Sequence, residues 1–230
     1  MKAVISGATR GIGKAIANKL ADLGYDLVIL ARDQQELQQS KLELSERNVA
    51  VQTVAIDLAH EEVEAKLKTA ATVFEGTSVL INNLGVYSMQ NAAEIQLHKL
   101  REQMNVNLYS AIALTQQIRK NGGSEALRSI VNIASVMSVK PASFAADYSM
   151  SKHAFKAWND ALREELRTKG TKVSAIYPGS VNTSSWDGLE VDRTAMIQAE
   201  DIAEMVECVL RMRENTLLEE IHVSPITFQP

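Results

Sequence analysis

Three side chains in the middle of the chain have the types and spacing that proton transfer to an oxygen atom requires. Tyr148 and Lys152 are four residues apart, so on a helix the phenol and the ammonium lie on one face. Ser135 ends an apolar run thirteen residues before Tyr148. A phenol beside a cation can act as a general acid or base, and a nearby hydroxyl can stabilise charge on a substrate oxygen. A Tyr-x-x-x-Lys pair arises by chance in roughly half of chains of this length, so it needs independent support.

A glycine-rich turn near the start of the chain gives that support. Residues 7–13 read GATRGIG and follow a short apolar run at 3–5. Apolar residues then recur at helical spacing. A turn between a strand and an amphipathic helix predicts a phosphate site, because glycines admit the phosphate closely and the helix N-terminus offers N–H groups. Together, the turn and the reactive side chains predict coupled transfer of a hydride and a proton.

Apolar runs alternate with helical stretches along the whole chain. Runs typical of buried strands occur at residues 3–5, 27–30, 51–56, 79–81, 130–133, 173–177 and 221–223. A charged helix is expected at 33–47, and the longest helices at 95–119 and 148–168. The alternation predicts a Rossmann-type, doubly wound α/β sandwich of three layers, with a mostly or wholly parallel sheet of about seven strands. Ligands of such sheets bind at the carboxyl ends of the strands.

Length and composition limit the possible classes of protein. The 230 residues, 46% of them hydrophobic, predict one domain over residues 1–230. A formal net charge of −4 gives no electrostatic case for nucleic acid or an anionic membrane. The pattern shows no signal peptide or membrane span, and the single cysteine fits a reducing compartment, so a soluble cytoplasmic protein is expected. The apolar neighbours of Cys208 predict a buried thiol, and the scattered histidines predict no metal site.

Several motifs together resemble the short-chain dehydrogenase/reductase family in its compact single-domain branch, over nearly the whole chain. The GxxxGxG turn and the Tyr-x-x-x-Lys pair are joined by residues 82–85 (NNLG), which are similar to the family's Asn-Asn-Ala-Gly segment. Residues 177–183 (YPGSVNT) resemble its nicotinamide-contacting turn. The resemblance implies an oxidoreductase that is similar to NADP-dependent carbonyl and 3-oxoacyl reductases.

The same resemblance assigns Asn107, Ser135, Tyr148 and Lys152 to a catalytic tetrad. Tyr148 would exchange a proton with the substrate oxygen, and Ser135 would stabilise charge on that oxygen. Lys152 would hold the nicotinamide ribose and, with the positive nicotinamide, lower the phenol pKa from its usual value near ~10. Asn107 would hold a water that resupplies the proton.

A cofactor site is implied as well, with NADP(H) preferred over NAD(H). Arg32 stands after the second strand, where an acidic residue would bind the ribose hydroxyls, and Arg10 lies within the glycine turn. Two guanidiniums suit a ribose 2′-phosphate. Asp33 could partly neutralise Arg32, and Leu84 replaces the family's alanine, which would lower cofactor affinity or repack the pocket. Asp57 would accept a bond from the adenine amine or, alternatively, cap a helix. The expected cofactor residues are Gly7, Thr9, Arg10, Gly11, Ile12, Gly13, Arg32, Asp57, Leu58, Asn83, Leu84, Gly85, Tyr148, Lys152, Pro178, Gly179, Val181 and Thr183.

The expected substrate is a small carbonyl or alcohol compound. An apolar pocket could be formed by Tyr87, Met89, Met137, Phe144, Trp186 and Leu189, although each could equally be core or interface. Family members pair subunits through the long helices, so a homodimer is expected first and a homotetramer second, because the family's usual carboxyl-terminal signature is missing. A catalytically silent NADP-binding sensor and a scaffold protein are the alternatives.

Overall fold

The computed structural model describes residues 1–59, 62–122, 127–188 and 190–227. Within these ranges, seven strands form one sheet in the order β3-β2-β1-β4-β5-β6-β7. All neighbouring strands pair in parallel. The strands are β1 (Lys2–Ser6), β2 (Asp26–Ala31), β3 (Val51–Ala55), β4 (Thr77–Asn82), β5 (Ser129–Ile133), β6 (Lys172–Pro178) and β7 (Glu220–Val223).

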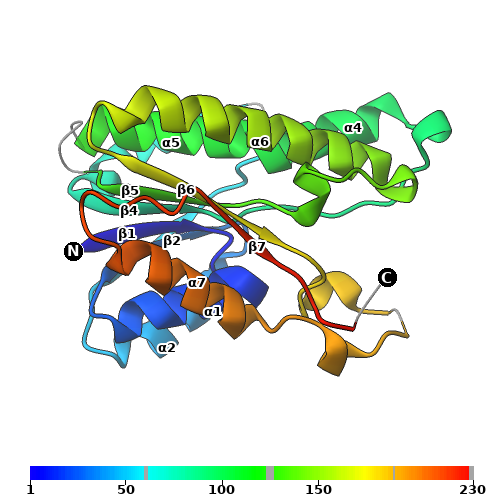
Figure 1. The fold of residues 1–230 in the computed structure, drawn as a ribbon. Helices are drawn as coiled ribbons and strands as arrows, with labels where there is room; N and C mark the ends of the chain where they lie inside the picture. Colours follow the sequence, from blue (N-terminus) through cyan, green and yellow to red (C-terminus); the bar gives the residue numbers. More distant parts are fainter. Residues whose placement is uncertain (60–61, 123–126, 189, 228–230) are drawn as a thin grey trace.

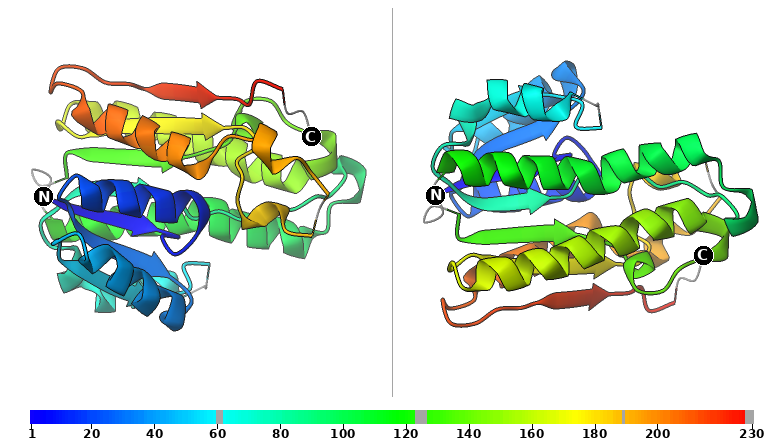
Figure 2. Two further views of the ribbon diagram at one scale, coloured as in Figure 1. Left: turned by 90° about the horizontal axis from the view of Figure 1, so that it is seen from below. Right: turned by 90° about the horizontal axis from the view of Figure 1, so that it is seen from above.

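Helices cover both faces of the sheet, which confirms the predicted three-layer Rossmann-type fold (Figure 1). One face carries α1 (Gly11–Asp22), α2 (Gln34–Ser45) and α7 (Ala199–Arg211), and the other carries α4 (Leu97–Met104), α5 (Ser110–Gly122) and α6 (Ala146–Arg167). The short α3 (Val63–Thr69) packs against α5. Figure 2 shows α1 beside α7 from one side and α5 beside α6 from the other. The expected long helix at 95–119 is interrupted by a π-helical segment, η3 (Asn105–Tyr109).

The central strands are buried on both faces. In β1, Ala3 and Ile5 pack into the core beneath α1 and α7, whereas Val4 packs into the core on the α5 side. The two faces alternate because successive side chains of a strand point to opposite sides. Both sets are apolar, so these strands are unbroken apolar runs in the sequence rather than alternating patterns.

A chain of buried amides ties the helices of one face to the sheet. Asn82 Nδ2 donates to Asn132 Oδ1 at 2.9 Å and to Thr115 Oγ1 at 3.1 Å. Asn132 Nδ2 in turn donates to Asn159 Oδ1 at 2.8 Å. These bonds connect β4, β5, α5 and α6 in a dry environment, where a hydrogen bond is electrostatically stronger than in water. They therefore fix the position of α6, the helix that carries Tyr148 and Lys152.

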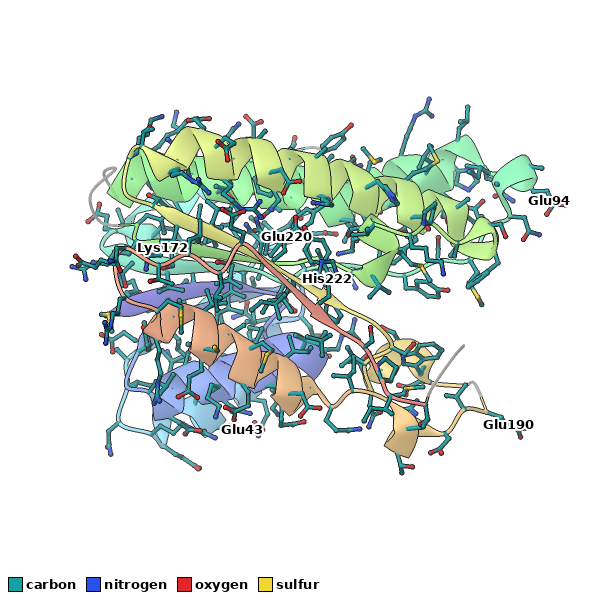
Figure 3. The ribbon with its side chains drawn as sticks, in the orientation of Figure 1. Glu43, Glu94, Lys172, Glu190, Glu220 and His222 are labelled. Atoms are coloured by element: carbon teal, nitrogen blue, oxygen red, sulfur yellow. The ribbon has the colours of Figure 1, made fainter. Side chains whose placement is uncertain are left out.

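The edge strand β7 is held to α6 by an ion pair and to β6 by ring stacking. Lys156 Nζ lies 2.5 Å from Glu220 Oε1. The ring of His222 stacks on the buried Tyr177, with ring centroids 4.6 Å apart. Figure 3 shows Glu220 and His222 on this strand at the edge of the sheet. These contacts hold the last strand in register beside β6.

The environment of Cys208 differs from the one that the sequence predicts. Cys208 is exposed on α7, so the prediction of a buried thiol is wrong. The helix buries Val206 and Val209 on one side, and position 208 falls on the other.

No helix in the described ranges has both the length and the apolar character needed to cross a membrane.

Candidate active site

The glycine-rich turn between β1 and α1 has the backbone shape of a phosphate cradle. Gly7 and Gly11 have φ values of 67° and 52°, in the left-handed region that favours glycine. Arg10 is the N-cap of α1, and its side chain makes no capping hydrogen bond. The first N–H groups of α1 therefore have no side-chain cap, which is the arrangement that binds anions at a helix N-terminus.

Gly13 lies behind this turn and holds its shape. A Cβ atom added at Gly13 would lie 2.0 Å from the carbonyl oxygen of Gly7 and 2.5 Å from Asn83 Nδ2. Asn83 Nδ2 donates to the carbonyls of Ser6 and Gly7, both at 3.1 Å. Ser6 Oγ accepts from the N–H groups of Asn83 and Leu84, again at 3.1 Å. Ser6 was not anticipated, although a hydroxyl at the end of the first strand was a visible signal.

An open cleft of about 840 Å³ extends from this turn along the carboxyl ends of the strands. Ligand sites in this fold lie at that edge, and the volume suits a ligand of dinucleotide size. Of the expected cofactor residues, those lining the cleft are Gly7, Thr9, Arg10, Gly11, Ile12, Arg32, Asp57, Leu58, Asn83, Leu84, Gly85 and Thr183. The remaining ones, Gly13, Tyr148, Lys152, Pro178, Gly179 and Val181, lie outside this lining.

The Pro-Gly turn after β6 is held against the edge of the sheet. Pro178 pairs with Val223, and the N–H of Gly179 donates to the carbonyl of Val223 at 2.8 Å. Val181 is buried and bridges to Ile197. The turn thus brings Thr183 to the cleft from a backbone anchored on β7.

Acidic and basic side chains meet at the end of β2. Asp33 Oδ1 accepts from the N–H groups of Gln35 at 2.7 Å and Glu36 at 2.9 Å, so this carboxylate caps α2. Glu36 Oε2 accepts a 2.8 Å hydrogen bond from Thr9 Oγ1 of the glycine turn. Sequence reasoning considered Asp33 and overlooked Glu36, whose signal was an acidic residue in the first turn of the helix after β2.

Asp57, after β3, has a local role as well as a place in the cleft. Its Oδ1 accepts from the N–H of Ala59 at 3.0 Å, which closes a short turn. The helix α3 begins later, at Val63. Asp57 is therefore not the cap of that helix, and it lines the cleft beside Leu58.

The reactive side chains converge where β5 ends and α6 begins. Ser135 lies two residues after the end of β5, and its side chain is hydrogen-bonded to that of Tyr148. Lys152 Nζ lies 5.8 Å from the centre of the Tyr148 ring and donates to the carbonyl of Ile133 at 3.3 Å. Lys152 is only 3% exposed, so its ammonium is held in a dry site.

Asn107 braces this group from the π-helical segment η3. Its Oδ1 accepts from the N–H of Val86 at 2.8 Å, and its Nδ2 lies 3.0 Å from the Val86 carbonyl and 2.9 Å from Ser151 Oγ. A Cβ atom added at Gly85 would lie 3.4 Å from both Asn107 Oδ1 and Lys152 Nζ. Val86 and Ser151 thus hold the Asn107 side chain in place, and a water at this residue stays a prediction. Ser151 was overlooked, although it immediately precedes Lys152 in the motif.

Burial has the largest effect on the pKa values of Tyr148 and Lys152. It raises the pKa of Tyr148 to about 12, while the hydrogen bond from Ser135 acts in the opposite direction and Tyr87 adds to the increase. Burial also lowers the pKa of Lys152 to about 8. Among the protein's own groups, removal of the phenolate from water therefore has the largest effect on the phenol pKa. The expected lowering, which includes the positive nicotinamide, stays a prediction.

The pKa of Lys152 predicts a pH dependence of stability. In the unfolded chain this lysine titrates at 10.5 and in the folded protein at about 8. Between these values the unfolded state binds more protons, so the contribution of Lys152 to stability rises with pH. We expect the difference in unfolding free energy between the protein and Lys152→Met to change over pH 8–10 by up to about 1.4 kcal/mol per pH unit. Urea unfolding measures it, with the exposed Lys99→Met as control; a flat difference for Lys152→Met contradicts the prediction.

Tyr87, one of the expected substrate residues, lies against the reactive phenol. Its ring centre is 5.0 Å from that of Tyr148, nearly perpendicular to it, and the side chain also lines the cleft. The loop that carries Tyr87 is joined to α6 by Asp147, which is fully buried and accepts from Ser88 Oγ and Gln90 Nε2. Asp147 was overlooked, because its burial depends on a loop distant in sequence.

The other expected pocket residues are more dispersed. Met137 follows Ser135 in the same turn, and its N–H donates to Ser135 Oγ at 3.1 Å. Met89 and Phe144 are exposed, at 60% and 43%. Trp186 Nε1 donates to the carbonyl of Val181 at 3.0 Å, on the segment after the Pro-Gly turn. Leu189 lies outside the described residues.

Comparison with known proteins identifies relatives along the whole chain. The chain is 29% identical over 225 residues to an uncharacterized oxidoreductase of Staphylococcus aureus (strain USA300), covering 97% of this chain and 96% of the relative. An alcohol dehydrogenase from the archaeon Thermococcus sibiricus, complexed with 5-hydroxy-NADP, has a similar structure, with a TM-score of 0.89, 25% identity and coverage of 100% and 98%. A metagenomic short-chain oxidoreductase in complex with NADP gives a TM-score of 0.83, with 28% identity and coverage of 100% and 98%.

A family model for short chain dehydrogenases matches residues 1–193, the part that holds the glycine turn, the cleft and the Ser135–Tyr148–Lys152 group. The expected resemblance is thereby confirmed. This chain belongs to the short-chain dehydrogenase family.

Proposed function

We propose that the protein is an NADPH-dependent reductase that transfers hydride to a small carbonyl compound, with Tyr148 as general acid. The observation that carries the proposal is the hydrogen-bonded pair of Ser135 and Tyr148, with the buried Lys152 one helical turn further along α6. This pair lies beside a cleft whose glycine turn is shaped for a phosphate.

The side chains divide the work of reduction between them. A bound nicotinamide dinucleotide supplies the hydride. Because burial holds the pKa of Tyr148 at about 12, its phenol is protonated at neutral pH and suited to donate a proton to the carbonyl oxygen. Ser135 hydrogen-bonds the same oxygen and stabilises the charge that develops there. Lys152, charged at neutral pH, holds the ribose hydroxyls and attracts the phenolate after the proton has left.

The basic residues of the cleft favour NADPH as the cofactor. Arg10 from the glycine turn and Arg32 from the end of β2 both line the cleft. Two guanidiniums at one place suit a ribose 2′-phosphate, which accepts paired, charge-assisted hydrogen bonds. Two related structures hold 5-hydroxy-NADP and NADP, which supports the same preference.

Removing either arginine is expected to weaken NADPH binding selectively. Arg32→Ala and Arg10→Ala should each raise the Kd for NADPH about ten- to hundredfold, the loss expected for charge-assisted hydrogen bonds, and leave NADH nearly unchanged. Fluorescence titration of the reduced nicotinamides measures both constants, with the exposed Arg101→Ala as control. Equal losses for the two cofactors would contradict a 2′-phosphate site.

The reaction itself is tested with oxidation of NADPH and NADH against diketones, aldehydes and 3-oxoacyl thioesters. Turnover with NADPH that disappears in Tyr148→Phe is the expected result. Tight NADPH binding with no turnover on the whole panel would favour a cofactor-binding sensor, and binding of neither cofactor would favour a scaffold protein.

We further propose a homodimer formed through the helices α5 and α6. Tyr109 and Met150 are large apolar side chains that are 51% and 49% exposed on this side of the molecule. Pairing of two subunits there would remove them from water. Light scattering distinguishes this dimer from a tetramer or a monomer. A cytoplasmic location remains a prediction.

A further inference from the structure

The carboxylate of Glu36 differs from the other carboxylates of the cofactor cleft in the kind of group that binds it. The described residues that line the cleft include four acidic ones, Asp33, Glu36, Asp57 and Asp187. Backbone N–H groups bind Asp33 and Asp57, and Arg193 pairs with Asp187 at 2.7 Å. Glu36 instead accepts its hydrogen bond from a neutral hydroxyl. Among the described residues, no cation forms an ion pair with this carboxylate, so it adds a negative charge to the cleft.

Glu36 shares this cleft with the two basic residues Arg10 and Arg32. Thr9, which precedes Arg10 in the glycine turn, also lines the cleft, and its Oγ1 donates to Glu36 Oε2 at 2.8 Å. Within the described ranges no ion pair of 4.0 Å or less joins Glu36 to either arginine. The same cleft thus presents two free cations and one carboxylate that holds a hydroxyl donor.

These groups act in opposite directions on the two forms of the cofactor. A ribose 2′-phosphate can accept hydrogen bonds from the guanidiniums and from the Thr9 hydroxyl. Glu36 already accepts the hydrogen bond of that hydroxyl, and its negative charge repels the phosphate. A ribose 2′-hydroxyl has no such charge, and it can donate to the free oxygen of the carboxylate. Glu36 therefore weakens binding of the phosphorylated cofactor and favours the other one.

We propose that Glu36 is a cofactor-specificity residue, an inference that rests on the proposed function. Its charge moderates the preference for NADPH that Arg10 and Arg32 create, and the protein therefore accepts NADH as well. Asp33, the acidic neighbour of Arg32 in the sequence, does not have this role, because its carboxylate caps α2.

The experiment is equilibrium binding of NADPH and NADH to the protein and to Glu36→Gln, which keeps the size and the acceptor oxygen of the side chain but removes its charge. Glu46→Gln is the matched control, because Glu46 is an exposed acid at the opposite end of α2. Displacement by adenosine 2′,5′-bisphosphate and by 5′-AMP shows whether any change arises at the adenosine end. Each titration is repeated at low and high salt.

Glu36→Gln should tighten NADPH and the bisphosphate about three- to tenfold, the effect of removing one partly screened like charge, with NADH unchanged or weaker. The gain should shrink at high salt, and Glu46→Gln should leave the cofactor ratio within about twofold. An unchanged ratio in Glu36→Gln, or an equal change in Glu46→Gln, overturns the role of Glu36 while NADPH binding itself still supports the reductase. A protein that binds neither cofactor overturns both proposals.

Discussion

The Tyr148→Phe variant is expected to lose about 10²- to 10⁴-fold in kcat, the usual contribution of a general acid. The phenol hydroxyl is the group hydrogen-bonded to Ser135, and burial holds it in the protonated form. Phenylalanine keeps the ring and its contact with Tyr87, so the fold and the Kd for NADPH should change little. Steady-state kinetics on an active substrate, with cofactor titration in parallel, measures the two effects separately.

Tyr109→Phe provides the matched control for this variant. Tyr109 loses the same hydroxyl but is exposed on η3, at the end of that segment. Its kcat should stay within about twofold of the parent value, because no proton donor at the site is removed. Full activity in Tyr148→Phe would show that another group supplies the proton, and the proposed mechanism would then be wrong.

Gly13→Ala is expected to destabilise the protein by about 1–3 kcal/mol and to abolish cofactor binding. The added methyl group would lie 2.0 Å from the carbonyl oxygen of Gly7, far inside contact distance. Since Gly7 belongs to the phosphate cradle, relief of the clash must distort the turn. Elsewhere in a helix, Gly→Ala stabilises by roughly 1 kcal/mol, so the sign of the change is diagnostic.

Gly24→Ala separates this clash from the general effect of replacing a glycine. Gly24 has a φ of 78°, but nothing lies within 4 Å of its added Cβ. That variant should lose about 1 kcal/mol from backbone strain and retain cofactor binding. Chemical denaturation and NADPH titration of both variants check the comparison. A Gly13→Ala protein with parental stability would show that the turn tolerates the methyl group.

The sheet could be predicted from the sequence because its strands are buried on both faces. The apolar run at 27–30 became β2 (Asp26–Ala31), and the runs at 79–81 and 130–133 became β4 and β5. The interruption of the long helix by η3 was not predicted, because apolar spacing does not specify which carbonyl each N–H group of a helix bonds. Apolar patterning reports which face is buried, not the hydrogen bonds of the backbone.

The site was predictable where residue types dictate chemistry and unpredictable where distant segments meet. Ser135 and Tyr148 could be paired in advance because the resemblance to the family assigns both to one catalytic group at the ligand edge of the sheet. The contact between Thr9 and Glu36 joins the glycine turn to α2, and no local pattern announces it. Likewise, the raised pKa of Tyr148 depends on burial created by the whole fold.

The charged contacts of β7 have a consequence for how copies of this protein can meet. An edge strand offers unpaired backbone groups to which another chain can add a strand, and charged side chains discourage this. Here Glu220 is held by Lys156, and His222 stands beside it with half of its side chain exposed. A further strand would have to cover these ionic groups and remove them from water. Extension of the sheet at β7 into an open-ended strand assembly is therefore opposed by the same residues that dock the strand.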